Sequence, residues 1–128
     1  MPVNVHFEDG FVHAVLSDPF TFEETARAYH STMQKLDFAL PVRAIIDVRQ
    51  VNRSVSTDEI YAMVNLVYPN RNKFSRRSAI VCQPNSLTFA LSRMFCAIAE
   101  CHEMDHTLFD DFEAARTWVT QRSSKASS

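Results

Sequence analysis

The chain has 128 residues, of which 46% are hydrophobic and 22% are charged, with a formal net charge of -2 and a pI near 6.2. This length and apolar content suit one domain with a core of its own. The slight excess of acidic residues argues against a dedicated nucleic-acid binder, and the single glycine, Gly10, excludes glycine-rich phosphate loops.

The cysteine count and the first ten residues indicate the cellular compartment in which we expect the chain to lie. Three cysteines and no apolar leader predict a reducing, cytoplasmic setting. The longest apolar runs are strand-sized, so we expect no membrane span. We expect one domain over residues 1–122 and a disordered polar tail over residues 123–128.

The N-terminal part of the chain predicts a hairpin followed by a helix. Residues 3–7 alternate between apolar and polar side chains, and Asp9-Gly10 is a strong hairpin signal. The apolar run over residues 11–16 supplies the second strand. Thr21 and Glu24 then form a capping box, which satisfies the amide donors at the start of a helix.

The stretch Val42 to Asn52 predicts the central strand. Ala44 to Val48 is a nearly continuous apolar run, which is typical of a strand buried on both faces. Asp47 lies in this run, so we expect its carboxylate to accept hydrogen bonds from backbone amides or an arginine. Ser56 and Glu59 form a second capping box, which opens the next helix.

The rest of the chain predicts two further strand–helix units. Residues 78–82 form a short apolar strand, and Asn85 is a candidate N-cap for the helix after it. Residues 107–109 are enough for a short edge strand, and Asp110 with Glu113 predicts a third capping box. The expected fold is α/β, with a mixed, mostly parallel five-stranded sheet and about four helices in the order β-β-α-β-α-β-α-β-α.

The loops after strands two to five should meet at the carboxyl edge of this sheet, where open α/β sheets bind ligands. The candidate partner or ligand residues there are Asp18, Arg49, Asn52, Arg53, Ser54, Ser56, Thr57, Gln83, Asn85 and, beside them, Asp110. A phosphate on Thr57 would lie at a helix start, but Asp58 and Glu59 would repel it. Capping by Ser56 explains the pattern, which leaves Thr57 a weak candidate phosphosite.

The third helix predicts two faces. Its expected core stripe is Leu87, Leu91, Met94, Phe95 and Ile98. The opposite stripe holds Phe89, Arg93, Cys96 and Glu100, and we expect Phe89 to be exposed there. An exposed aromatic beside an arginine is typical of interfaces, so Phe89, Arg93 and Cys96 form a candidate surface for homodimerisation. Single exposed apolar residues are also ordinary.

A basic patch precedes the fourth strand. It consists of Arg71, Lys73, Arg76 and Arg77. Such a patch suits an acidic partner, a phospholipid headgroup or nucleic acid, or it is a solvated loop that keeps the domain in solution.

The cysteines and histidines predict neither a metal site nor an enzyme. On a helix, Cys96 points away from Cys101 and His102, and the spacing does not match zinc-finger pairs. Cys82 ends a buried strand, where an inert apolar thiol is usual. No histidine oriented by a carboxylate is evident beside a nucleophile, so we expect no catalysis and no cofactor.

Several local signatures resemble the STAS-like superfamily, which contains the anti-sigma-factor antagonists and small bacterial relatives. They are the strands at 44–48 and 79–81, the segment 90–95 and the ending 109–119. In the antagonists, an Asp-Ser-Ser-Gly motif follows the central strand, and its second serine is phosphorylated. Residues 55–58 hold this place but lack the aspartate and glycine of the motif, with Thr57 at the position of the hydroxyl.

Two functions follow from the resemblance. The first is a non-catalytic STAS-like regulatory or protein-interaction module, which binds a protein partner through the loops at the carboxyl edge. The alternative is a small-molecule or lipid-binding domain of CRAL-TRIO-like architecture, with a small apolar ligand between the second helix and the sheet.

Overall fold

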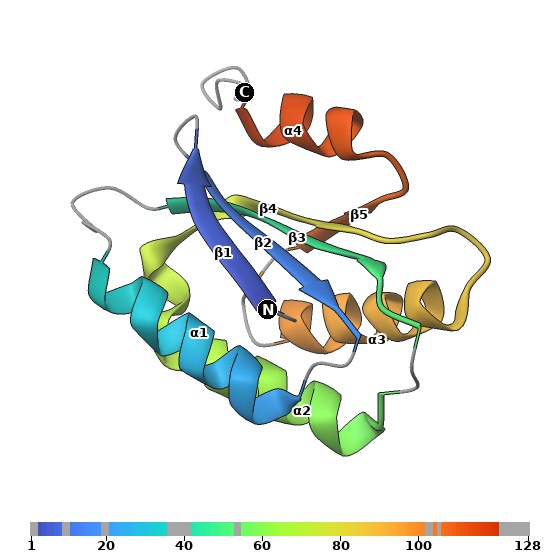
Figure 1. Cartoon of the computed structure of the whole chain (residues 1–128), viewed down its shortest axis with the longest axis horizontal. Coiled ribbons are helices and arrows are strands. Elements are labelled where there is room, and N and C mark those ends of the chain that lie inside the picture. The colour runs from blue at the N-terminus through green and yellow to red at the C-terminus, as the bar shows by residue number, and fades with distance from the viewer. Residues whose placement is uncertain are drawn as a thin grey trace.

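The computed structural model describes residues 3–8, 11–18, 21–35, 42–52, 55–101, 104 and 106–120, and the side chains of all of these except residues 8 and 71–77. The elements are β1 (Val3–Glu8), β2 (Phe11–Ser17), α1 (Phe22–Lys35), β3 (Val42–Gln50), α2 (Thr57–Val67), the 3-10 helix η1 (Tyr68–Lys73), β4 (Phe74–Val81), α3 (Leu87–Cys101), β5 (His106–Phe109) and α4 (Phe112–Thr120) (Figure 1). The predicted tail, 123–128, lies outside the described residues. No described helix has both the length and the apolar character needed to cross a membrane.

The strands form one sheet in the order β1-β2-β3-β4-β5. β1 pairs antiparallel with β2, and the other three pairs are parallel. The predicted mixed, mostly parallel sheet is therefore confirmed, with β3 in the middle and β5 at one edge. Glu8 pairs with Phe11, which confirms the hairpin, while the turn residues 9–10 lie outside the described ones.

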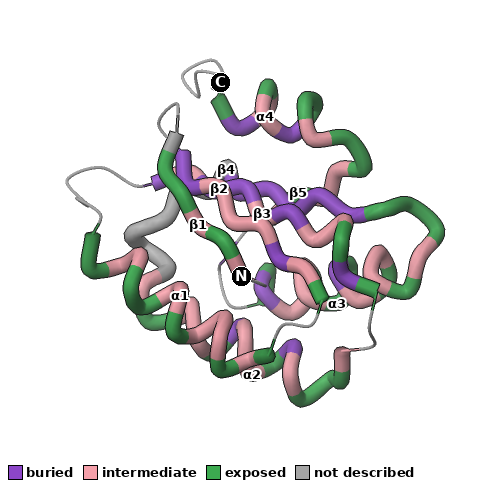
Figure 2. The backbone as a smooth tube through the Cα atoms, in the orientation of Figure 1, coloured by how far each residue is buried: buried purple, intermediate pink, exposed green. Residues whose placement is uncertain are grey.

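One face of the sheet is covered by a single helix, and the other face is covered by three helices. α4 lies alone over one face, and α1, α2 and α3 lie over the other (Figure 1). On the α4 face, Phe11, Ile45 and Val81 are fully buried against Ala115 and Val119, and Figure 2 shows buried backbone along the middle strands. This continuous apolar cluster fixes α4 to the sheet.

The three-helix face is packed more loosely. Within its described residues, α1 has no buried side chain. α2 buries Ile60 and Val64, and α3 buries Ser92 and Ala99. α1 therefore keeps its apolar side chains only half-covered, although its sequence has the amphipathic spacing of a core helix.

The fourth strand begins earlier than predicted. β4 starts at Phe74 rather than Ser78, so Arg76 and Arg77 lie in the strand and not before it. Phe74 pairs with Val42, and the register of the two strands shifts before Ala44. Pairing with a distant strand extends β4 through residues whose own pattern is polar.

The predicted N-cap and core stripe of α3 were both wrong in detail. The cap is Ser86, whose hydroxyl oxygen accepts the backbone N–H of Phe89 at 3.0 Å. Asn85 lies in the preceding turn with a positive φ of 57°, a conformation that asparagine tolerates better than most residues. Leu87 is 54% exposed and Met94 37% exposed, whereas the buried residues of this helix are Ser92 and Ala99, the latter packed with Val64 of α2.

Two predicted capping boxes are confirmed and the third is displaced. Ser56 and Glu59 each accept the other's backbone N–H at 3.1 Å, and Thr21 with Glu24 does the same at 3.0 Å. At α4 the cap is Asp111, one residue after the predicted Asp110, because Asp111 directly precedes the first helical residue and accepts the N–H of Ala114 at 3.0 Å. This displacement leaves Asp110 in the loop after β5.

Candidate functional site

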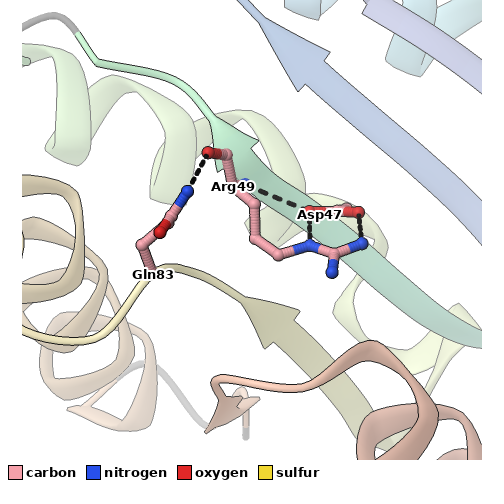
Figure 3. Close-up of polar contacts among 3 residues, drawn as sticks. All are labelled: Asp47, Arg49 and Gln83. Atoms are coloured by element: carbon pink, nitrogen blue, oxygen red, sulfur yellow. Dashed lines mark hydrogen bonds and ion pairs between the residues drawn. The ribbon is translucent and has the colours of Figure 1, made fainter.

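The parallel strands bring the predicted loop residues to one edge. Asp18 follows β2, Asn52 follows β3 and Gln83 follows β4, and these strands are parallel neighbours. The Asp18 carboxylate accepts the backbone N–H of Asn52 at 2.6 Å. Gln83 Nε2 donates to the carbonyl of Arg49 at 3.3 Å (Figure 3). These bonds hold three successive loops together. Arg53 and Ser54 lie outside the described residues.

Asp47 and Arg49 form an ion pair beside this edge. Arg49 donates its backbone N–H and its Nε to Asp47 Oδ1 at 3.0 Å, and one terminal nitrogen to Oδ2 at 2.7 Å (Figure 3). The predicted environment of Asp47 is thereby confirmed. Burial by itself would raise the pKa of Asp47, but the hydrogen bonds and charge of Arg49 outweigh it and hold that pKa below its ordinary value. The Arg49 guanidinium also lies 5.8 Å from the centre of the Phe112 ring.

The hydroxyls at the start of α2 have different roles. Ser56 is the N-cap and takes part in the box with Glu59. Thr57 is exposed and is the first residue of the helix. The structure thus assigns Ser56 a capping role and leaves Thr57 accessible beside Asp58.

Two of the three predicted interface residues, Arg93 and Cys96, line a groove at the β5 edge of the sheet, and Phe89 is not among its lining residues. Arg93 is exposed, and Phe89 and Cys96 are half-buried, so Phe89 is less accessible than expected. The groove has a volume of about 660 Å³, and its walls include Arg93, Cys96, Ala97 and Glu100 of α3, His106, Thr107 and Leu108 of β5, and Trp118 of α4. Burial raises the pKa of the Cys96 thiol to about 11, with smaller contributions from Cys82 and Glu100.

The basic patch is only partly described. The backbone of Arg71 and Lys73 lies in η1, and that of Arg76 and Arg77 in β4. Their side chains lie outside the described ones. The patch starts at the amino end of β4, which is the end of the sheet opposite the loops.

An apolar cavity lies between the sheet and its three-helix face. Its volume is about 480 Å³. Lining residues include Ala28, Tyr29 and Met33 of α1, Ile60, Met63 and Val67 of α2, Leu91 and Phe95 of α3, and Val12, Ala44, Ile46 and Ile80 of the sheet. The alternative function predicted from the sequence placed a small apolar ligand between the second helix and the sheet. The cavity is broader, because α1 and α3 also form its walls.

The cavity lining is mostly apolar and carries a few hydroxyl groups and the His106 imidazole. In the described part of the chain, no aspartate, glutamate, lysine or arginine lines it. Tyr29 Oη accepts a hydrogen bond from Asn70 Nδ2 at 3.2 Å. Burial raises the pKa of Tyr29 and outweighs this bond, which acts in the opposite direction. Sequence reasoning missed the α1 side of the cavity; the small residue Ala28, where a core helix usually carries a larger one, is the local signal for it.

The cysteines show the environment of structural thiols. Cys82 is fully buried, and burial raises the pKa of its thiol, while a hydrogen bond with Ser92 acts against the rise. Across the described residues, no group of three or more metal-ligating side chains lies together.

Comparisons with known proteins identify the fold. No protein-family model and no curated protein matches the chain. Among solved structures, the chain is similar to an uncharacterised protein of the DUF3478 family from Shewanella loihica PV-4, whose fold is described as SpoIIAA-like. The two share 15% sequence identity with a TM-score of 0.62, over 91% of each chain. The chain therefore has a SpoIIAA-like α/β fold, and the STAS-like resemblance is confirmed for the fold.

Proposed function

We propose, from this SpoIIAA-like, STAS-like fold, that the chain is a non-catalytic binding module that holds a small uncharged apolar molecule beneath α1, α2 and α3. The observation that carries the proposal is the cavity of about 480 Å³ with its mostly apolar lining. Sites for small molecules in proteins have volumes of about 300–1,000 Å³ and mostly apolar walls. The three free cysteines, Cys82, Cys96 and Cys101, fit the proposed reducing compartment.

The energetics favour an occupied cavity. The cavity is partly open to solvent, and its walls are mostly apolar. An apolar ligand would gain contacts with these walls, whereas water gains little between walls with few polar groups.

The state of α1 supports the same proposal. None of its described side chains is buried, although Tyr29 and Met33 face the cavity. A ligand between α1 and the sheet would cover these side chains and complete the packing of the helix. The buried part of the ligand should be uncharged, because the described lining holds no aspartate, glutamate, lysine or arginine to pair with a charge.

Native mass spectrometry of freshly purified protein tests this proposal. We expect a bound molecule that is released on denaturation. Ala28→Phe fills the cavity from α1 and should lower the bound fraction at least about tenfold. Ala26→Phe makes the same change on the same helix, at a residue outside the lining, and should leave binding intact.

Two results would contradict the proposal. One is protein of unligated mass that also fails to bind a neutral fluorescent probe such as N-phenyl-1-naphthylamine. The other is equal loss of ligand in Ala28→Phe and Ala26→Phe, which would show that the ligand lies elsewhere.

A second candidate function is recognition of a protein partner by the loops at the carboxyl edge. It is favoured by the Asp18–Asn52 and Arg49–Gln83 hydrogen bonds, which fix the loops before any partner arrives. Pre-organised loops lose less entropy on binding. Asp18→Ala should weaken capture of such a partner without affecting the apolar ligand. Equal capture by Asp18→Ala and wild-type protein would contradict this second function.

A further inference from the structure

The outer edge of β5 is open to a further strand. β5 is the last strand of the described sheet. The carbonyl of Phe109 accepts the backbone N–H of Cys82, beside β4, at 3.0 Å. Backbone groups of alternate residues point to opposite sides of a strand, so the N–H and C=O of Leu108 point away from β4. No described strand lies beyond β5 to bind them.

Sheet edges of this kind are usually protected, and β5 has one such protection, its length of only four residues, but lacks others. Its sequence, His-Thr-Leu-Phe, has no lysine, glutamate or proline. These residues are the common devices that prevent edge-to-edge pairing. The groove of about 660 Å³ lies over this edge, with α3 on one side and Trp118 of α4 on the other. A partner strand would therefore contact side chains as well as backbone.

We infer that the β5 edge pairs antiparallel with the β5 edge of a second copy of this chain. The charges that line the groove are the reason why we infer a second copy of the chain as the partner. Arg93 and Glu100 are both exposed on the groove face of α3. They are two turns apart, about 10 Å along the helix, and so too far apart to bond within one copy.

In a dimer with a two-fold axis through the groove, each of these two side chains can pair with the opposite charge on the other copy. The axis sets the two α3 helices antiparallel, so Arg93 of each copy faces Glu100 of the other. One patch that carries both charges at opposite ends is self-complementary, as isologous dimers require. The same axis sets Leu108 opposite Leu108, where two backbone hydrogen bonds form, and covers Trp118, an aromatic anchor typical of interface centres.

Charge exchange tests this interface without disturbing the fold, because Arg93 and Glu100 are exposed. Sedimentation equilibrium should show a concentration-dependent dimer for the wild-type chain. Arg93→Glu and Glu100→Arg each place like charges across the axis, and each should raise the dimer Kd at least about tenfold. The double variant Arg93→Glu/Glu100→Arg restores opposite charges and should return the Kd to within about threefold of wild type.

Mixing the two single variants gives a sharper result. One copy then carries two acidic groups and the other two basic groups, so the mixture should form heterodimers although each variant alone is monomeric. Arg27→Glu makes the same charge change at an exposed residue of α1, outside the groove, and should leave the Kd unchanged. Circular dichroism spectra should be alike for all the variants, since the exchanged side chains are exposed and the fold is retained.

The inference is overturned if the wild-type chain is monomeric at every concentration. It is also overturned if a dimer forms but neither single variant weakens it, which would place the contact on another surface such as β1. Failure of the double variant and of the mixture to recover would show that Arg93 and Glu100 do not face each other. Ligand binding in the cavity is independent of each of these results.

Discussion

Asp47 and Arg49 are two residues apart on the central strand, and their side chains close a bidentate ion pair on one face of the sheet. The distances are 3.0 Å from Arg49 Nε to Oδ1 and 2.7 Å from a terminal nitrogen to Oδ2. Alternate residues of a strand project to the same side, so the pair is local and needs no distant partner. Phe112 of α4 lies over the guanidinium. The pair therefore ties the end of the buried strand to the start of the last helix.

Removal of the Asp47 carboxylate should destabilise the domain. Asp47 is 5% exposed, whereas the Arg49 side chain is 41% exposed and can regain water. Asp47→Ala should therefore lower the free energy of unfolding by about 1–3 kcal/mol. Urea denaturation measures the change, with the exposed Asp58→Ala as control, where a few tenths of a kcal/mol are expected from the helix dipole. An equal effect of both variants would show that Asp47 is solvated.

The same carboxylate should make stability depend on acid pH. Its pKa in the folded state is lowered from the ordinary value of 3.8, so the folded chain binds this proton less readily than the unfolded chain does. The stabilisation is present above the unfolded pKa and is lost as the pH falls through the lower, folded pKa. The difference in unfolding free energy between wild type and Asp47→Asn should thus shrink as the pH falls below about 4. Parallel curves from pH 7 to pH 2 would contradict this.

Features set by adjacent residues could be predicted from the sequence. The Ser56–Glu59 and Thr21–Glu24 boxes need only a few consecutive residues, and both form. The environment of Asp47 was also predictable, because its arginine is two positions away. The order of the elements followed from the same local patterns, and the family resemblance supported it.

Features set by distant contacts were missed or displaced. The start of β4 depends on the pairing of Phe74 with Val42. The residues after Phe74 are polar and give no strand pattern, so the sequence alone did not predict this start. Ser86 rather than Asn85 caps α3, since the turn holds Asn85 at positive φ. The extent of the cavity depends on how far α1 lies from the sheet, and no local pattern encodes that distance.

The three thiols should differ in reactivity. Cys82 is fully buried, Cys96 is half-buried in the groove, and Cys101 is exposed. With a pKa of about 11, Cys96 is on the order of a thousandth thiolate at pH 8. Iodoacetamide at pH 8, followed by peptide mass mapping, should modify Cys101 first and Cys96 much more slowly. Equal rates at the two sites would contradict the burial of Cys96.

Trp118, the only tryptophan, reports on the packing of α4. It is half-buried, with its ring centre 5.5 Å from that of Phe109. Its emission should be blue-shifted in the native state and should shift to the red on unfolding. Because its burial is partial, Trp118→Ala should cost about 2–3 kcal/mol rather than the 3–5 typical of full burial. Native emission at the wavelength of a fully exposed tryptophan would contradict this placement.

Thr57 should carry no phosphate in the native host. The backbone N–H groups of Ser56 and Glu59 are already bound within the capping box, so they are not available to a phosphate at the start of α2. Arg49, a cation at the same edge of the sheet, is held by Asp47. Asp58 adds a like charge beside the hydroxyl, where a dianion would be repelled.

Intact mass of the chain isolated from its native host measures this directly. We expect one species at the unmodified mass, unchanged by phosphatase treatment. A substantial species about 80 Da heavier, removed by phosphatase and mapped to Thr57 or Ser56, would reverse the conclusion. Such a phosphate would need donors other than the N–H groups of Ser56 and Glu59, which the capping box holds.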